Sequence, residues 1–230
     1  MPFKIGVVRF PGTNCDSETK RALVENIPEA NISFLSQECD ELSDLDAVVL
    51  PGGFSYGDYL RAGAIAARAP IGRALKDYAA KGGVILGICN GFQQLQELGL
   101  LPGALVKNES GRFYCGSVKV IVDGSQSAAT KLINSGQRCS LPVAHGEGRF
   151  WCDEKTLKKL EANGQIVLRY AEGNNPNGSL ANIAGISNTK GNVVGMMPHP
   201  ERNADGLQGS GEGSLFLRSL GAFLERGHCE

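Results

Sequence analysis

The glycine-flanked cysteine at position 89 stands in a pattern typical of a catalytic nucleophile. Cys89 lies between Gly87 and Gly91, after the apolar residues 83–86 and before a helical pattern at 92–98. This order predicts a strand, a sharp turn and a helix, as in the G-x-S-x-G nucleophile elbow, with sulfur in place of oxygen. The glycines leave room where the two backbones meet. The amino end of the helix favours the thiolate over the thiol.

A buried structural cysteine is the alternative, since free cysteine is among the most buried residue types. Packing alone does not explain a glycine two residues before and two residues after Cys89. We therefore interpret Cys89 as a nucleophile. Because the predicted turn is tight, we also expect Cys89 to adopt an unfavourable backbone conformation.

A thiol nucleophile needs a base and a group that orients the base. Residues 198–201 read Pro-His-Pro-Glu and follow the apolar residues 193–197. On an extended backbone, His199 and Glu201 would share a face, and the two prolines favour that extended shape. A surface histidine beside an unrelated glutamate is the alternative for so short a motif. Combined with the cysteine elbow, the motif favours His199 as base and Glu201 as its partner.

His145 is the other histidine in a distinctive motif, His-Gly-Glu-Gly-Arg at 145–149. It lacks the two prolines that flank His199 at positions 198 and 200. We therefore rank His145 below His199 as a base and expect it to face a partner or support the pocket.

Attack on a carbonyl also requires donors that stabilise the oxyanion. The N–H of Asn90, directly after the nucleophile, is the first candidate. Gly52 and Gly53 follow the predicted strand at 46–50 and could present a second N–H, because glycine allows close approach of the backbone. An ordinary Pro-Gly turn is the alternative for these two residues.

Composition argues against several classes of protein. The chain has 230 residues, 42% hydrophobic and 20% charged, without repeats or a linker, so we expect one domain over residues 1–230. A net charge of −1 without a dense Lys/Arg run argues against nucleic-acid binding. Seven scattered cysteines argue against a disulfide scaffold or structural zinc site, and we predict no metal. Without a signal peptide or membrane-spanning run, we expect a reducing, cytoplasmic location.

Alternating apolar and amphipathic stretches predict an α/β fold with a doubly wound, mostly parallel sheet. In the first half, strands are expected at residues 5–8, 32–35, 46–50 and 84–86. Helices are expected at 16–26 and 62–80. Pro70 could interrupt the second helix, because proline cannot continue a helix without losing a hydrogen bond.

The second half of the chain contains more strands than helices, so we expect antiparallel additions to the parallel core. The expected strands are residues 114–122, 141–144, 166–170, 183–187 and 193–197. The expected helices are 154–161 and 214–224. Residues 189–192 read as a hairpin turn, and the glycine-rich residues 204–213 read as a mobile loop.

Several motifs carry a resemblance to a known family. Pro-Gly-Gly at 51–53, Gly-x-Cys-x-Gly at 87–91 and His-x-Glu at 199–201 resemble the class I glutamine amidotransferases. Longer motifs are similar to the small glutaminase subunits of phosphoribosylformylglycinamidine synthases. They are residues 9–16, 52–64, 89–93, 145–149 and 197–202. The resemblance spans nearly the whole chain and implies a class I glutamine amidotransferase fold.

The resemblance also implies residues that bind the substrate. Gln93 matches a position that contacts glutamine. An exposed polar position on a helix is the alternative for this residue. Asn108, Ser110 and Phe113 resemble a segment that lines the glutamine pocket.

By the same resemblance, Cys89, His199 and Glu201 would form a triad that hydrolyses L-glutamine. The ammonia would pass to a large synthetase subunit that converts formylglycinamide ribonucleotide to formylglycinamidine ribonucleotide in de novo purine biosynthesis. ATP and Mg are expected on that partner, since this chain has no G-x-x-x-x-G-K-[ST] sequence, and we expect no cofactor in the chain itself. A small third subunit would bridge the complex. The motifs after Gly53 and around His145 are candidates for the contact.

Two alternatives from other functional classes share parts of this pattern. A stand-alone cysteine hydrolase or peptidase could use the same scaffold without a partner, although the Pro-His-Pro-Glu segment argues against it. A non-catalytic regulatory subunit could keep the fold, although the intact Cys89, His199 and Glu201 argue against that interpretation.

Overall fold

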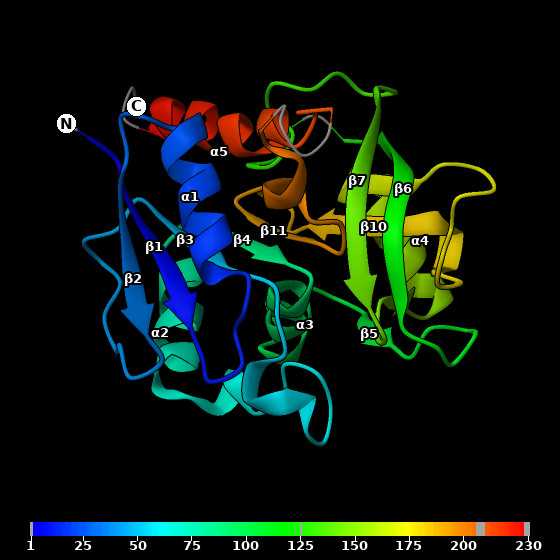
Figure 1. Cartoon of the computed structure of the whole chain (residues 1–230), viewed down its shortest axis with the longest axis horizontal. Helices are drawn as coiled ribbons and strands as arrows, with labels where there is room; N and C mark the ends of the chain where they lie inside the picture. The colour runs from blue at the N-terminus through cyan, green and yellow to red at the C-terminus, as the bar shows by residue number, and fades with distance from the viewer. Residues whose placement is uncertain (1, 125, 206–209, 228–230) are drawn as a thin grey trace.

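The computed structural model describes residues 2–124, 126–205 and 210–227. Within these residues, nine strands form one sheet in the order β2-β1-β3-β4-β11-β10-β9-β6-β7, and two short strands pair separately (Figure 1). β4, from the middle of the chain, therefore lies next to β11, the last strand, near the centre of the molecule.

Five strands form the parallel half of the sheet. They are β1 (Lys4–Arg9), β2 (Asn31–Ser36), β3 (Ala47–Leu50), β4 (Val84–Ile88) and β11 (Val193–Met196). β1 pairs with β2 and β3, β3 with β4, and β4 with β11, all in parallel. Every residue of β3, β4 and β11 is buried, so both faces are covered there, as is usual for parallel sheets.

Four strands extend the sheet in antiparallel fashion. They are β10 (Ile183–Ser187), β9 (Ile166–Tyr170), β6 (Tyr114–Val122) and β7 (Arg138–His145). β10 pairs antiparallel with β11, which confirms the predicted hairpin turn at 189–192. Burial alternates along most of β7, as expected for a strand with one face on the core. The predicted combination of a parallel core with antiparallel additions is confirmed.

In the described residues, five α-helices pack around the sheet. They are α1 (Asp16–Asn26), α2 (Pro70–Ala80), α3 (Asn90–Glu97), α4 (Glu154–Ala162) and α5 (Ser214–Gly227). α1 contacts both α5 and β1, whereas α3 contacts β3, β4 and β11. Asp153 caps α4, where its side chain accepts a hydrogen bond from the Thr156 N–H. None of the helices in the described ranges is long and apolar enough to cross a membrane.

The predicted helix at 62–80 is shorter than expected. Only η2 (Ala66–Arg68), a 3-10 turn, precedes α2, which begins at Pro70. Proline has no N–H to continue a preceding helix but fits the first helical position, so Pro70 starts a new helix.

Some short elements escaped sequence analysis. β5 (Ala104–Val106) and β8 (Arg149–Trp151) form a two-stranded antiparallel pair, and three residues carry too little periodicity to reveal a strand. Three 3-10 turns were also missed: η1 (Ser55–Asp58), η3 (Leu180–Asn182) and η4 (Pro200–Asn203). Part of the loop expected at 204–213 lies outside the described residues.

Candidate active site

Cys89 occupies the sharp turn between β4 and α3, beside β11 at the centre of the molecule (Figure 1). Its backbone angles are φ 51° and ψ −103°. A positive φ in a non-glycine residue costs about 1–2 kcal/mol, so the predicted strain at Cys89 is confirmed. A Cβ on Gly91 would lie 2.0 Å from the Leu50 carbonyl oxygen. Glycine is therefore required there by the close approach of α3 to β3.

Both halves of the sheet surround the Cys89 side chain. The Cys89 N–H donates to the Met196 carbonyl on β11 at 2.7 Å. The thiol donates to the Ala144 carbonyl on β7 at 3.6 Å, and only 5% of the residue is exposed. The nucleophile is thus enclosed at the amino end of α3, where the helix dipole stabilises negative charge.

His199 and Glu201 form a buried pair directly after β11. His199 Nδ1 lies 2.6 Å from Glu201 Oε1. The predicted pairing is confirmed, but its expected backbone basis was wrong. His199 is extended, with φ −101° and ψ 90°, whereas Glu201 lies in the η4 turn that starts at Pro200. The turn, rather than an extended run, brings the carboxylate back to the imidazole.

Electrostatics favour the protonated form of His199. Burial alone would lower the pKa of His199, but the negative charges of Glu201 and Cys89 outweigh burial and raise this pKa well above its usual value. Among the described residues, His199 Nε2 and Glu201 Oε2 have no hydrogen-bond partner. Because Nδ1 faces Glu201, Nε2 is the ring nitrogen available for proton transfer. His199 interacts electrostatically with both Glu201 and Cys89, so the structure brings these three residues together.

The three candidate oxyanion donors lie next to this group. Gly53 has φ 141°, a conformation that side chains rarely adopt, and a Cβ on Gly52 would lie 2.6 Å from His199 Cε1. Asn90 is the first residue of α3, so the helix provides no acceptor for its N–H. Their roles in binding an oxyanion stay predictions.

Comparison with known proteins agrees with this geometry. Residues 2–214 match the family described as the CobB/CobQ-like glutamine amidotransferase domain. The chain belongs to this glutamine amidotransferase family.

Relatives of this amidotransferase chain match it over almost their full length. A protein from Nostoc sp. named phosphoribosylformylglycinamidine synthase subunit PurQ is 50% identical over 217 residues, which cover 94% of this chain and 96% of the relative. A protein of the same name from Aquifex aeolicus is 48% identical over 224 residues, 94% of this chain and 98% of the relative. A chain from the solved structure of PurLQS from Thermotoga maritima is 41% identical, has a TM-score of 0.88 and covers 97% of this chain and 100% of its own. The expected enzyme class and fold class are confirmed.

Gln93 is buried inside the amidotransferase fold, so the alternative of an exposed helix position was wrong. Its side chain donates to the Glu147 carbonyl at 2.8 Å and accepts from Asn90 Nδ2 at 2.9 Å. The side chain is therefore held next to the residue that follows the nucleophile. A direct contact between Gln93 and glutamine stays a prediction.

The other three predicted substrate contacts lie in different environments. Asn108 is buried and uses its amide to brace the surrounding loops: Nδ2 donates to the Arg112 and His145 carbonyls, both at 2.9 Å. Ser110 is exposed and accepts from the Arg112 N–H at 3.2 Å. Phe113 is 53% exposed. Their role in lining a glutamine pocket stays a prediction.

His145 braces this loop through Asn108. It is only 3% exposed, and its Nδ1 lies 3.1 Å from Asn108 Oδ1. Burial, together with the nearby charge of His199, lowers the pKa of His145 to about 4, so it is neutral at pH 7. Of the two expected roles, support of the pocket agrees with the structure, and its burial argues against direct contact with a partner.

Cys15, a second buried thiol at this site, was not predicted as a site residue from the sequence. Its sulfur accepts a hydrogen bond from Arg202 Nη2 at 3.1 Å, and Arg202 Nε donates to Glu18 at 3.1 Å. Ligand atoms of Cys15, His199 and Glu201 lie within 4.8 Å of one another, a spacing that could hold a metal ion. The Arg202 guanidinium on the sulfur opposes binding of a cation there. The signal was available, because Cys15 lies in the motif at 9–16.

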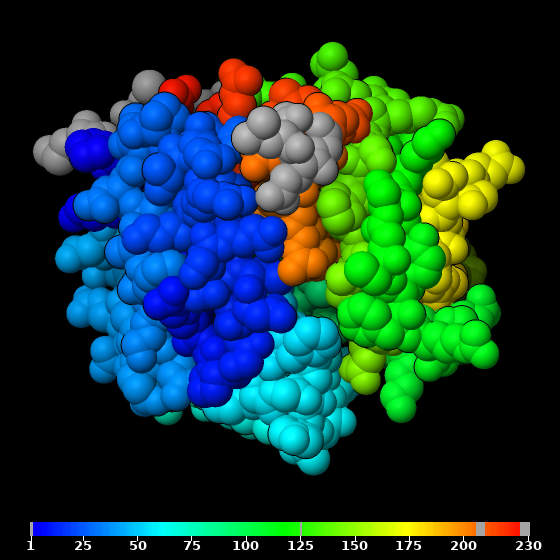
Figure 2. All heavy atoms as spheres, viewed as in Figure 1, coloured from blue at the N-terminus to red at the C-terminus, as the bar shows by residue number. Residues whose placement is uncertain are grey.

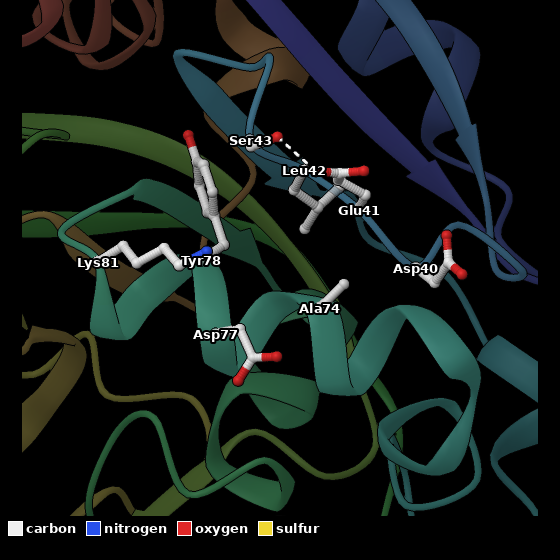
Figure 3. Close-up of a pocket in the computed structure, with 8 residues that line it drawn as sticks. All are labelled: Asp40, Glu41, Leu42, Ser43, Ala74, Asp77, Tyr78 and Lys81. Atoms are coloured by element: carbon white, nitrogen blue, oxygen red, sulfur yellow. Dashed lines mark hydrogen bonds between the residues drawn. The ribbon is translucent and has the colours of Figure 1, made fainter.

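A hollow of about 250 Å³ lies between the loop before β3 and the end of α2. Its lining includes Asp77 and Tyr78 of α2 and Lys81, the residue after α2 (Figure 3). These segments precede β3 and β4, whereas Cys89 follows β4. Ligands in parallel sheets bind at the carboxyl ends of the strands, so this hollow is separate from the candidate active site.

Proposed function

We propose that the chain is the glutaminase subunit of a phosphoribosylformylglycinamidine synthase. One structural observation carries this proposal: the strained Cys89 at a helix start, enclosed beside the buried His199–Glu201 pair. Relatives named as PurQ subunits of that enzyme, about half identical over nearly their full length, support it. The continuous sheet, which takes strands from β1 to β11, supports one glutaminase domain over the whole chain.

In the proposed reaction, the Cys89 thiolate attacks the side-chain amide carbon of L-glutamine. The N–H groups of Asn90 and of Gly52 or Gly53 stabilise the oxyanion. His199, oriented by Glu201, protonates the leaving nitrogen, and ammonia departs to leave a thioester. Water then attacks the thioester carbon, its proton passes to His199, and glutamate leaves as the thiolate reforms. Glutamine and water thus become glutamate and ammonia.

The ammonia would be used on another chain. We propose that a large synthetase subunit, which holds ATP and Mg, converts formylglycinamide ribonucleotide to formylglycinamidine ribonucleotide in purine biosynthesis, and that a small subunit bridges the two. The chain itself is proposed to need no cofactor. The name of the solved Thermotoga maritima assembly, PurLQS, supports a complex of several subunits.

A chloroketone analogue of glutamine tests the proposed site. It should alkylate Cys89, as located by peptide mass spectrometry, and excess L-glutamine should protect that residue. The exposed Cys115 provides an internal control, because its alkylation should be independent of glutamine. The Cys89→Ser variant should show no protected label. Labelling of Cys89 that glutamine does not reduce, together with cleavage of peptide substrates, would favour the stand-alone hydrolase. No glutamine-protected label in the assembled complex would favour a regulatory subunit.

A further inference from the structure

Asn90, the residue after the candidate nucleophile, has a side chain that is fully engaged. Its Oδ1 accepts from the Ser55 N–H at 3.2 Å and from Gln94 Nε2 at 2.9 Å. Its Nδ2 donates to Asp58 Oδ1 at 3.0 Å and to Gln93 Oε1 at 2.9 Å. Two of these four contacts come from residues 54–62, which directly follow Gly53 and are called the tip loop below. The tip loop therefore helps to fix the position of Asn90.

The tip loop has a strained backbone. Tyr56, Asp58 and Leu60 have φ values of 54°, 53° and 69°, all in the region that favours glycine. Strain of this kind persists only where surrounding contacts enforce it, and it concentrates at functional sites. The Tyr56 N–H donates to the Pro11 carbonyl at 2.6 Å, and the Ala62 N–H donates to Glu147 Oε2 at 3.4 Å. Between these two anchors, the Asp58–Asn90 hydrogen bond connects the loop to the elbow.

The residues that flank this connection face solvent. Tyr59 is 74% exposed and Leu60 is 94% exposed. Phe54, also in the tip loop, and Phe113 are about half exposed, with ring centroids 6.2 Å apart. Figure 2 shows the cyan segment after β3, which contains the tip loop, protruding from the lower edge of the molecule. Exposed apolar side chains on a strained loop do not stabilise this chain by itself. They are suited to an apolar surface on another protein.

We propose that Asp58 is a positioning residue for the Asn90 N–H. Tyr59 and Leu60 contact the ammonia-accepting subunit, and Asp58 couples this contact to the position of Asn90. This inference rests on the proposed function, which supplies the partner. An oxyanion donor must lie about 2.7–3.1 Å from the developing charge, so a small movement of Asn90 changes transition-state stabilisation. The protein that contacts Tyr59 and Leu60 is the synthetase rather than a second copy of this chain, because the tip loop directly follows the candidate oxyanion glycines. Ammonia released at Cys89 must pass from this region to its acceptor.

Two variants at position 58 separate positioning from strain. Asp58→Gly removes the carboxylate but suits the positive φ, so the backbone is not strained by the change. In the assembled complex, we expect its kcat for glutamine-dependent amidine formation to fall roughly a hundredfold, comparable to losing an oxyanion donor, with little change in KM for glutamine. Asp58→Asn keeps a carbonyl acceptor for Asn90 and should recover most of that loss. Asp77→Asn, in the hollow of Figure 3, is the matched acidic control and should behave as wild type.

A second pair of variants tests the docking contact. Leu60→Ser should weaken binding of the chain to the synthetase, measured by calorimetry, by about tenfold or more. Leu132→Ser, at an exposed leucine contacting α5, should leave this affinity unchanged.

The coupling inference is overturned if Asp58→Gly keeps wild-type kcat in the complex, or if its ammonium-driven synthesis falls as much as its glutamine-driven synthesis. Unchanged affinity of Leu60→Ser would overturn the docking contact. The proposed function fails separately, if wild-type Cys89 shows no glutamine-protected labelling.

Discussion

At the scale of single residues, the charge of His199 links the candidate base to stability. A buried imidazolium paired with Glu201 stabilises the fold fully below the ordinary pKa of 6.5, and this contribution is lost as the pH rises through the higher pKa of the folded state. We expect the free energy of unfolding to fall more steeply above pH 6.5 for wild type than for His199→Gln, measured by chemical denaturation. Parallel curves would show that His199 keeps an ordinary pKa.

The two buried histidines should differ in their effect on catalysis. His199→Ala removes the proposed base, so we expect glutamine hydrolysis to fall by roughly a thousandfold or more. His145→Gln removes a brace of the Asn108 loop and should reduce turnover by less than about tenfold. Rates are compared in the assembled complex by glutamate release. The assignment fails if His199→Ala retains wild-type turnover or if His145→Gln is the more damaging change.

Residue-level prediction worked where a short motif carries its own geometry. The strained turn at Cys89 was predicted from its glycines. The pairing of His199 with Glu201 was predicted from their spacing, although the extended backbone expected from the two prolines was wrong. Cys15 was not recognised, because its approach to His199 depends on the missing side chain of Gly52, far away in the chain. The Asp58–Asn90 hydrogen bond joins residues 32 positions apart and has no local signature.

At the scale of elements, the elbow depends on how closely α3 approaches β3. A Cβ on Gly91 would meet the Leu50 backbone oxygen at 2.0 Å, and a backbone atom cannot move aside as a side chain can. We expect Gly91→Ala to destabilise the fold by on the order of 3 kcal/mol, measured by denaturant unfolding. Gly146→Ala is the control, because its Cβ would make an ordinary contact 3.7 Å from Phe113. Equal stability of both variants would show that the turn relaxes easily.

The parallel strands were predictable because each is a short apolar run next to an amphipathic helix. The buried β3 and β4 and the helix α1 illustrate this, the last with bounds of 16–26 as expected. The η4 turn was not predictable, since prolines at 198 and 200 also suit an extended chain. The β5–β8 pair is stabilised by contacts between distant segments rather than by local propensity.

At the scale of the whole molecule, the candidate site lies where the two halves of the sheet meet. The parallel half supplies Cys89 after β4 and His199 after β11. The antiparallel half supplies the Ala144 carbonyl that accepts from the thiol and the Pro142 carbonyl that accepts from the His199 N–H. Enclosing the nucleophile therefore requires both halves of the sheet. The sequence predicted that a parallel and an antiparallel half exist, but not that they meet at Cys89.

The central claim is that this chain liberates ammonia and another chain consumes it. The most direct measurement compares amidine formation by the reconstituted complex with glutamine and with an ammonium salt, using wild-type and Cys89→Ala chains. We predict that Cys89→Ala abolishes synthesis from glutamine and leaves synthesis from ammonium unchanged, because only the first nitrogen source needs the thiol. Equal loss with both nitrogen sources, in a complex that assembles normally, would contradict the account.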